Sequence, residues 1–183
     1  MTHTIDITRP VPDLSAALAR IGSAVVSGAL VVDARANERS GVFGEMMLTF
    51  FKGRGGAGIV VDGCIRDFAA ARQLGIGLWL RGTTANFHTQ TDLMPFAVNQ
   101  PIACGDALVI PGDIIVADDD GVVVVPAAKA AAVLADAGKH VEWEDFSRLR
   151  LSQGGDLRKY YPLSEEGERE YRAWRRDQRA GDG

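Results

Sequence analysis

Residues 44–67 read GEMMLTFFKGRGGAGIVVDGCIRD, and this stretch decides the fold. Its first part has apolar residues at helical spacing, and the glycines that follow predict the end of a helix. The continuous apolar run at residues 57–61 is typical of a strand covered on both faces. The pattern therefore predicts a helix, a glycine-rich turn and a buried strand, followed by a tight turn that presents Arg66 and Asp67.

The same alternation extends to both sides of this stretch. Residues 29–32 predict a buried strand, followed by a charged connection at residues 33–40. Residues 68–74 predict a short helix and residues 76–80 a further strand. Helices that alternate with strands indicate parallel pairing with crossover helices, so we expect an α/β fold.

The N-terminal residues give weaker signals. Residues 1–12 are polar, carry two prolines and predict an irregular arm. Asp13 can cap a helix that we expect to continue to Ile21, because the apolar residues there fall at helical spacing.

The second half of the chain no longer shows this alternation of helices and strands. Residues 82–95 predict a loop, and residues 96–126 predict short strands separated by turns, one of them at Asp118-Asp119-Asp120-Gly121. Pro126 begins a long helix that is expected to reach about Leu151, and a charged helical tail follows. We expect one domain over residues 1–151 and a C-terminal helical arm over residues 152–183.

Composition excludes several classes of protein. The chain has 183 residues and a net charge of −4, so no basic face indicates nucleic-acid binding. Cys64 and Cys104 are too few for a disulfide framework or a zinc cluster, and buried, reduced thiols are expected. No signal peptide or membrane-spanning run is recognisable, which predicts a soluble, cytoplasmic protein without membrane partners.

Three charged residues could form a site. Taken singly, Glu45 fits a capping acid at a helix start, and Arg66 beside Asp67 fits a surface ion pair. However, a helix packed antiparallel on the strand that follows it returns the chain to the level of the helix start. Glu45, Arg66 and Asp67 could therefore meet outside the carboxyl end of the strand, where α/β proteins place ligands. Carboxylates there could hold a magnesium-type ion, and the arginine could bind a carboxylate or stabilise an enolate.

Several separated motifs closely resemble the RraA-like family. The resemblance runs from about Gly28 through the tail, and the motifs that carry it are Gly44-Glu45-Met46-Met47, residues 57–67, Arg81-Gly82, Pro111-Gly112-Asp113 and residues 117–126. That family includes class II aldolases for 4-hydroxy-4-methyl-2-oxoglutarate and 4-carboxy-4-hydroxy-2-oxoadipate, and the regulator of ribonuclease E activity. Its older label is dimethylmenaquinone methyltransferase.

The resemblance implies a swivelling β/β/α fold and a homotrimer or a dimer of trimers, with sites between subunits. It implies that Asp67 binds a divalent metal, Mg²⁺ or Mn²⁺, and that Arg66 holds the pyruvate enolate. Glu45 would order a metal-bound water, and the Met46 and Met47 amides beside Gly44 would bind the pyruvate carboxylate. An acid from a neighbouring subunit, Glu142 or Glu144, would complete the water shell.

The activity implied is that of a class II lyase that forms pyruvate through a metal-stabilised enolate. The reaction would be retro-aldol cleavage of a 4-hydroxy-2-oxo acid, decarboxylation of oxaloacetate, or both. The alternative is a non-catalytic oligomer that regulates a ribonuclease by protein binding. The chain departs from the family's aldolases in two ways: Glu45 replaces an Asp, and the segment before Gly28 is shorter than usual.

Overall fold

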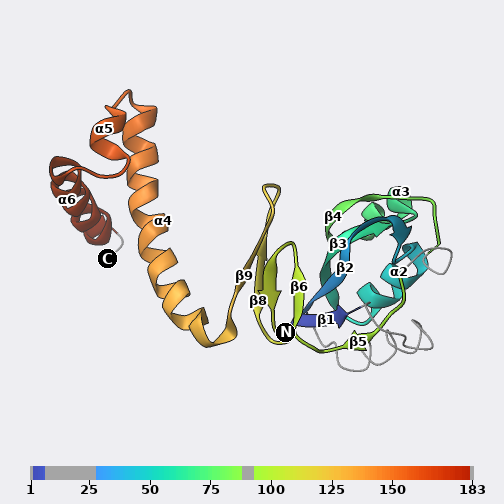
Figure 1. Ribbon diagram of the computed structural model, residues 1–183. Coiled ribbons are helices and arrows are strands. Elements are labelled where there is room, and N and C mark those ends of the chain that lie inside the picture. The colour runs from blue at the N-terminus through green and yellow to red at the C-terminus, as the bar shows by residue number, and fades with distance from the viewer. Residues whose placement is uncertain (1, 7–27, 88–92, 182–183) are drawn as a thin grey trace. The chain divides into compact units, whose positions relative to one another are not determined.

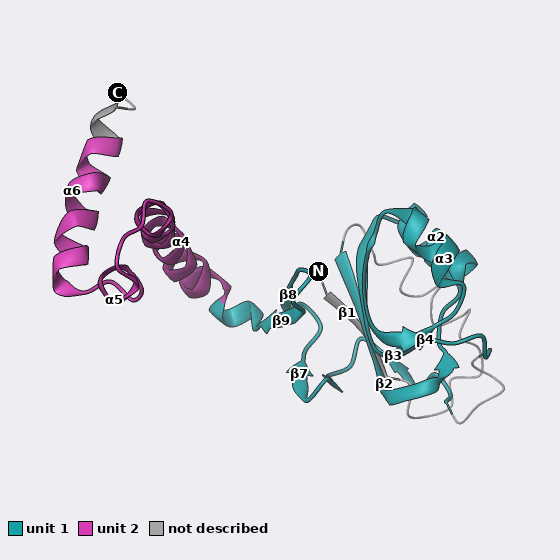
Figure 2. Ribbon diagram, turned by 90° about the horizontal axis from the view of Figure 1, so that it is seen from above, with its two compact units in different colours: residues 1–129 teal, residues 130–183 magenta. Residues whose placement is uncertain are grey.

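The computed structural model describes residues 2–6, 28–87 and 93–181. Contacts divide the chain into two compact units, Met1–Lys129 and Ala130–Gly183 (Figure 2). Among the described residues, no helix has both the length and the apolar character needed to cross a membrane.

The first unit is built on a five-stranded sheet (Figure 1). Across the sheet the strands are β4 (Gly77–Thr83), β3 (Gly56–Ile65), β2 (Gly28–Gly41), β1 (Thr2–Asp6) and β5 (Ala97–Val98). The first four are parallel, and β5 runs antiparallel to β1. Helix α2 (Glu45–Gly53) connects β2 to β3, while α3 (Phe68–Ala71) and the 3₁₀ turn η1 (Arg72–Leu74) connect β3 to β4. The predicted α/β fold with parallel pairing is confirmed.

Alternation along the strands sends side chains to two different cores. Val32 and Ile59 belong to a buried cluster that includes Leu48 of α2. Val31 and Val60, one residue away along each strand, belong to a second cluster. That second cluster also includes residues of two antiparallel hairpins, β6 (Ile102–Cys104) with β7 (Ala107–Val109) and β8 (Ile114–Ala117) with β9 (Val122–Val125). Hairpins, sheet and helices therefore form a β/β/α arrangement of layers.

Strand β2 is longer than the sequence pattern predicts. The charged connection expected at residues 33–40 is wrong, because the strand continues to Gly41. Val32 pairs with Val61 and Asn37 pairs with Gly63, so β2 uses five residue steps where β3 uses two. Arg35 and Ala36 take positive φ values of 54° and 55° within this excess. Residues 33–36 thus form a wide irregularity inside a continuous strand.

Two further expectations fail because strand pairing overrides local signals. A turn predicted at Asp62-Gly63, ahead of Arg66, is wrong, since β3 runs unbroken to Ile65. The irregular arm is wrong over Thr2–Asp6, which pairs in parallel with residues 29–33 of β2. The helix expected from Asp13 to Ile21 lies outside the described residues.

The second unit contains α4 (Ala130–Ser152), α5 (Leu157–Tyr160) and α6 (Glu165–Gly181). Phe146 of α4 is fully buried, and its ring lies 5.9 Å from Tyr160, 5.6 Å from Tyr171 and 5.5 Å from Trp174. These aromatic contacts join all three helices. The predicted boundary after residue 151 falls near the end of α4, whereas the compact units divide where α4 begins.

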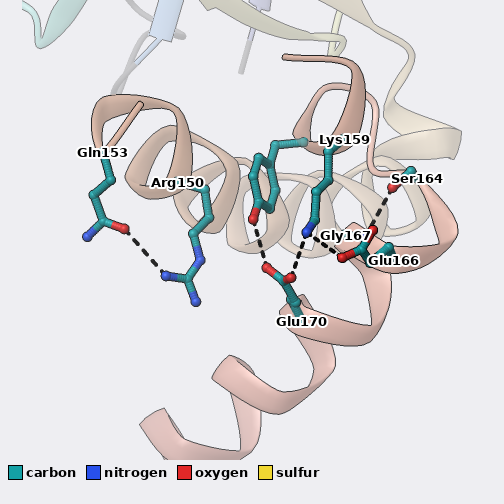
Figure 3. A network of polar contacts seen from close by, with 8 residues as sticks. Arg150, Gln153, Lys159, Ser164, Glu166, Gly167 and Glu170 are labelled. Atoms are coloured by element: carbon teal, nitrogen blue, oxygen red, sulfur yellow. Dashed lines mark hydrogen bonds and ion pairs between the residues drawn. The ribbon is translucent and has the colours of Figure 1, made fainter. Parts of the chain in front are cut away.

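Polar contacts add to this aromatic core (Figure 3). The Tyr160 hydroxyl donates to Glu170 at 2.8 Å, and Lys159 Nζ lies 2.7 Å from Glu166 and 2.8 Å from Glu170. Hydrogen bonds from Lys159 and Tyr160 lower the pKa of Glu170. Arg175 of α6 also contacts Glu142 of α4 at 2.6 Å. The unit therefore has a core and a polar network of its own.

A buried carboxylate fixes the loop between β7 and β8 in the first unit. Asp113 is 6% exposed, and its two oxygens accept the Ile110 amide at 2.9 Å and the Ala127 amide at 3.0 Å. It thereby ties the turn after Pro111 to the chain that follows β9. The resembling Pro111-Gly112-Asp113 motif has a structural role here.

We expect Asp113→Asn to lower the free energy of unfolding by about 1–3 kcal/mol, because one acceptor oxygen becomes a donor that faces an N–H group. Urea unfolding followed by circular dichroism measures the change. Asp120→Asn, at an exposed turn position, is the matched control and should stay within about 0.5 kcal/mol of the native chain. Equal midpoints for Asp113→Asn and the native chain would contradict the role of this carboxylate.

Candidate functional site

The start of α2 and the end of β3 meet at the carboxyl edge of the sheet. The Glu45 amide donates to Asp67 Oδ2 at 3.4 Å, and Arg66 Nε lies 3.3 Å from the same oxygen. These residues are separated by a helix and a strand, as the spacing argument requires. The structure therefore brings Glu45, Arg66 and Asp67 together.

The absence of a side chain at Gly44 makes this approach possible. A Cβ at that position would lie 2.6 Å from Asp67 Oδ2 and 2.8 Å from Arg66 Nε, closer than real contacts allow. Asp67 itself takes a left-handed conformation with φ 57°, and its carbonyl accepts the Ala70 and Ala71 amides of α3. Aspartate is one of the few residues other than glycine that adopt this conformation readily, and here it turns the chain from β3 into α3.

The first turn of α2 offers free amide groups. The Leu48 amide makes the first intrahelical bond, to the Gly44 carbonyl at 3.2 Å. The Met46 and Met47 amides precede it, so neither has an acceptor within the helix. With the positive end of the helix dipole, these two groups can bind a carboxylate. The guanidinium of Arg66 adds a second positive group nearby.

Glu45 is held by its own helix. Thr49 Oγ1 donates to Glu45 Oε1 at 2.8 Å, one turn along α2. The Glu45 side chain is partly exposed. One carboxylate oxygen is thus fixed, and Glu45 remains open to water.

Arg66 is held by an aromatic ring that the sequence analysis missed. The guanidinium carbon lies 4.7 Å from the centroid of the Phe87 ring, a cation–π distance. The chain before Phe87 is tied to β2, because the Gly41 amide donates to the Asn86 carbonyl and Asn86 Nδ2 donates to the Arg39 carbonyl, both at 3.0 Å. Within the described part of the chain, the two terminal nitrogens of Arg66 make no hydrogen bond, so they can form a two-point contact with an anion.

A sequence pattern could have linked Thr49 to the site, but no such pattern exists for Phe87. Thr49 follows Glu45 by four residues, a spacing that places both on one helix face. Phe87 lies in the segment predicted as a loop, and no local pattern links it to Arg66.

Asp67 and Glu45 offer oxygen ligands of the kind that a hydrated divalent cation takes. The described residues contain no group of three or more His, Cys, Asp or Glu side chains that could hold a metal ion. A magnesium-type ion keeps several waters and is often bound by one or two carboxylates, which Asp67 and Glu45 can supply. The donors are all oxygen, the type that such an ion prefers.

The remaining acids named by the resemblance lie in the second unit. Glu142 contacts Arg175 at 2.6 Å, and Glu144 lies 3.2 Å from His140. Both are on α4, and both have partners inside their own unit.

Sequence comparison places this chain in a known family. A model of the RraA-like family, described as Aldolase/RraA, matches residues 4–124. A Halalkalibacterium halodurans protein, provisionally named 4-hydroxy-4-methyl-2-oxoglutarate aldolase, is 39% identical over 110 residues. The match covers 60% of this chain and 51% of that protein, so the chain spans about half the length of this curated relative.

Solved structures agree with the sequence comparison. Streptomyces coelicolor RraAS2, titled an unusual member of the RNase ES inhibitor RraA family, is 43% identical with a TM-score of 0.75, over 81% of this chain and 76% of that one. The RNA-processing inhibitor RraA of Thermus thermophilis is 25% identical with a TM-score of 0.55, over 68% and 73%. Because the family model covers most of the first unit, including the Glu45, Arg66 and Asp67 site, the chain belongs to the RraA-like family.

Proposed function

We propose that this chain is a class II, metal-dependent lyase that releases pyruvate from a 4-hydroxy-2-oxo acid, from oxaloacetate, or from both. The observation that carries the proposal is the meeting of Arg66 and Asp67 with the first turn of α2. That arrangement supplies an anion-binding helix end, a cation and two carboxylates at one edge of the sheet. The provisional aldolase name of a 39% identical relative supports the same reaction class.

Substrate binding begins with the carboxylate beside the 2-oxo group. The Met46 and Met47 amides would donate to that carboxylate at the helix start. Arg66 would then face the 2-oxo oxygen with its terminal nitrogens. Both contacts fix the reacting carbons relative to Glu45.

Cleavage breaks the bond between C3 and C4 and leaves its electron pair as the pyruvate enolate. In the aldol substrate, Glu45 acting through a water would accept the proton of the 4-hydroxyl group, which becomes a carbonyl. In oxaloacetate, C4 leaves as carbon dioxide. A proton returned to C3 completes pyruvate in either case. Arg66 would stabilise the negative enolate oxygen, an interaction that strengthens as the charge develops.

Asp67, with Glu45 acting through water, would hold a divalent cation, Mg²⁺ or Mn²⁺. When bound, such an ion polarises the 2-oxo group as a Lewis acid. Glu142 or Glu144 of a neighbouring subunit would complete its water shell in a homotrimer or dimer of trimers.

We expect pyruvate release to require Mg²⁺ or Mn²⁺, to stop after chelation, and to fall about 10²–10³-fold in kcat for Arg66→Ala, the usual cost of removing an oxyanion donor. Asp67→Ala should lose metal dependence together with activity. A lactate dehydrogenase-coupled assay measures release from oxaloacetate and from 4-hydroxy-4-methyl-2-oxoglutarate.

Lys52→Ala is the matched control for this assay, because it removes an exposed cation from the last turn of the same helix. It should keep the native rate. Equal turnover with and without metal, or an unaffected Asp67→Ala variant, would overturn the proposal.

We expect Phe87→Leu to lower kcat/KM about 2- to 30-fold, since a cation–π contact contributes about 0.5–2 kcal/mol to holding the guanidinium. Phe87→Tyr keeps the ring face and should retain the native value. In an Arg66→Ala background, Phe87→Leu should have little further effect, because the two side chains act as one unit. A native kcat/KM for Phe87→Leu would show that the ring does not position Arg66.

A regulatory function is the second candidate, supported by the 43% identity to a member of the RNase ES inhibitor RraA family. A protein that inhibits a ribonuclease by contact does not need Arg66 to stabilise an enolate. On this alternative, RNA cleavage by ribonuclease E falls when the chain is added, and Arg66→Ala inhibits equally well. Gel-based RNA cleavage with both proteins measures this, and unchanged cleavage would exclude the candidate.

A further inference from the structure

A cavity lies in the first unit, away from the Glu45, Arg66 and Asp67 site. It is a cavity of about 480 Å³ that includes none of these three residues in its lining. Its walls come from strands β2–β4 and from the hairpins β6–β7 and β8–β9, on the face that carries the second core cluster. Small-molecule cavities in proteins commonly have about 300–1,000 Å³, so this volume suits a small organic ligand.

Most of the cavity wall is apolar. Val31, Val60 and Trp79 stand in one row across three neighbouring strands, since Val31 pairs with Val60 and Val60 pairs with Trp79. Val122 and Val124 of β9 face this row from the hairpin. The Trp79 indole is fixed in place, because Nε1 donates to the Asp118 carbonyl at 2.8 Å. The ring therefore forms a rigid aromatic wall.

A carboxylate lies further along the same strands. Asp62 follows Val60 by two residues and faces the same side of the sheet. Its side chain is 10% exposed, and one of its oxygens accepts Arg81 Nε. Its second oxygen makes no hydrogen bond within the described part of the chain. The mostly buried Asp62 side chain thus lines the cavity and offers it one carboxylate oxygen that has no donor among the described residues.

The charged side chains of the cavity lining are two carboxylates, Asp62 and Asp119, and one cation, Arg81. The hydrogen bond to Asp62 and the charge of Asp62 raise the pKa of Arg81, and the charges of Asp106 and Glu38 add to this. Burial raises the pKa of the Cys104 thiol to about 12, and Asp62 adds to this more strongly than Arg81 opposes it. Arg81 alone does not balance the surrounding acids, so an anion is disfavoured and a cation is favoured.

We propose that this cavity binds a small organic amine, with an aromatic or aliphatic body against Val60 and Trp79 and an ammonium group that donates to the second oxygen of Asp62. The indole face of Trp79 offers the ammonium a further favourable contact. The cavity would thus be an amine-binding site on the opposite face of the sheet from α2. It does not depend on lyase activity.

Three ligands with one common body test the sign of charge that the cavity prefers: 3-phenylpropylamine, 3-phenylpropan-1-ol and 3-phenylpropanoate. Each is titrated into the full chain by isothermal calorimetry at neutral pH. The Trp79 indole N–H signal is followed by NMR and assigned with Trp79→Phe. We expect the amine to bind most tightly and to shift the Trp79 signal.

Asp62→Asn should weaken the amine about tenfold or more, the usual effect of losing a hydrogen bond to a charged group. Arg81→Gln is the second variant, because it removes the competing cation and keeps Asp62. It should bind the amine at least as tightly as the native chain. Arg66→Ala should leave amine binding unchanged, which separates this proposal from the lyase.

Any of three results would overturn the proposal. The carboxylate could bind more tightly than the amine, which would make Arg81 the anchor. Amine affinity could be unchanged in a folded Asp62→Asn variant. The amine could also fail to shift the Trp79 signal at millimolar concentration.

Discussion

The close approach between the backbone of Gly44 and the side chains of Arg66 and Asp67 is the constraint on which the site depends. It places the positive end of α2 against a carboxylate and a guanidinium at the carboxyl edge of the sheet. Coulomb interactions weaken with distance and with hydration, so a side chain at position 44 would separate these groups and admit water between them. The left-handed conformation of Asp67 completes the geometry, because it turns the chain directly from β3 into α3.

The sheet keeps two kinds of chemistry apart. Strand alternation sends one set of side chains toward α2 and α3 and the next set toward the hairpins. The Glu45, Arg66 and Asp67 site forms where β3 ends, whereas Asp62 and Trp79 point into the hairpin layer. Under the two proposals, one sheet would bind ligands of opposite charge: an anion at the start of α2, and a cation in the cavity that Asp62 lines.

The sequence predicted those parts of the fold that depend on elements consecutive along the chain. A helix followed by a buried strand fixes where Glu45 meets Arg66, and that convergence was predicted correctly from spacing. The resemblance to the RraA-like family was also confirmed. Pairing between distant segments was not predictable: β1 joins β2 through backbone hydrogen bonds that carry no side-chain signal. Phe87 reaches Arg66 for the same non-local reason, since its position depends on how residues 84–87 return to β2. The extension of β2 over residues 33–41 was not predicted, because this segment is charged and strands are recognised in a sequence by the alternation of apolar residues.

The irregularity in β2 gives the chain room to change length over evolutionary time. Pairing with β3 is anchored on one side by Val32 and on the other by Asn37, and residues 33–36 exceed what the partner strand requires. Asp33 still pairs with Asp6 of β1 and Ala34 is buried in the core, whereas Arg35 and Ala36 are exposed, and the Arg35 amide donates to Asp33. An insertion beside the exposed Arg35 and Ala36 would therefore stay inside the irregularity, and the register that leads to Gly44 would be preserved. Variation in length can therefore accumulate a few residues from the site while its geometry stays the same.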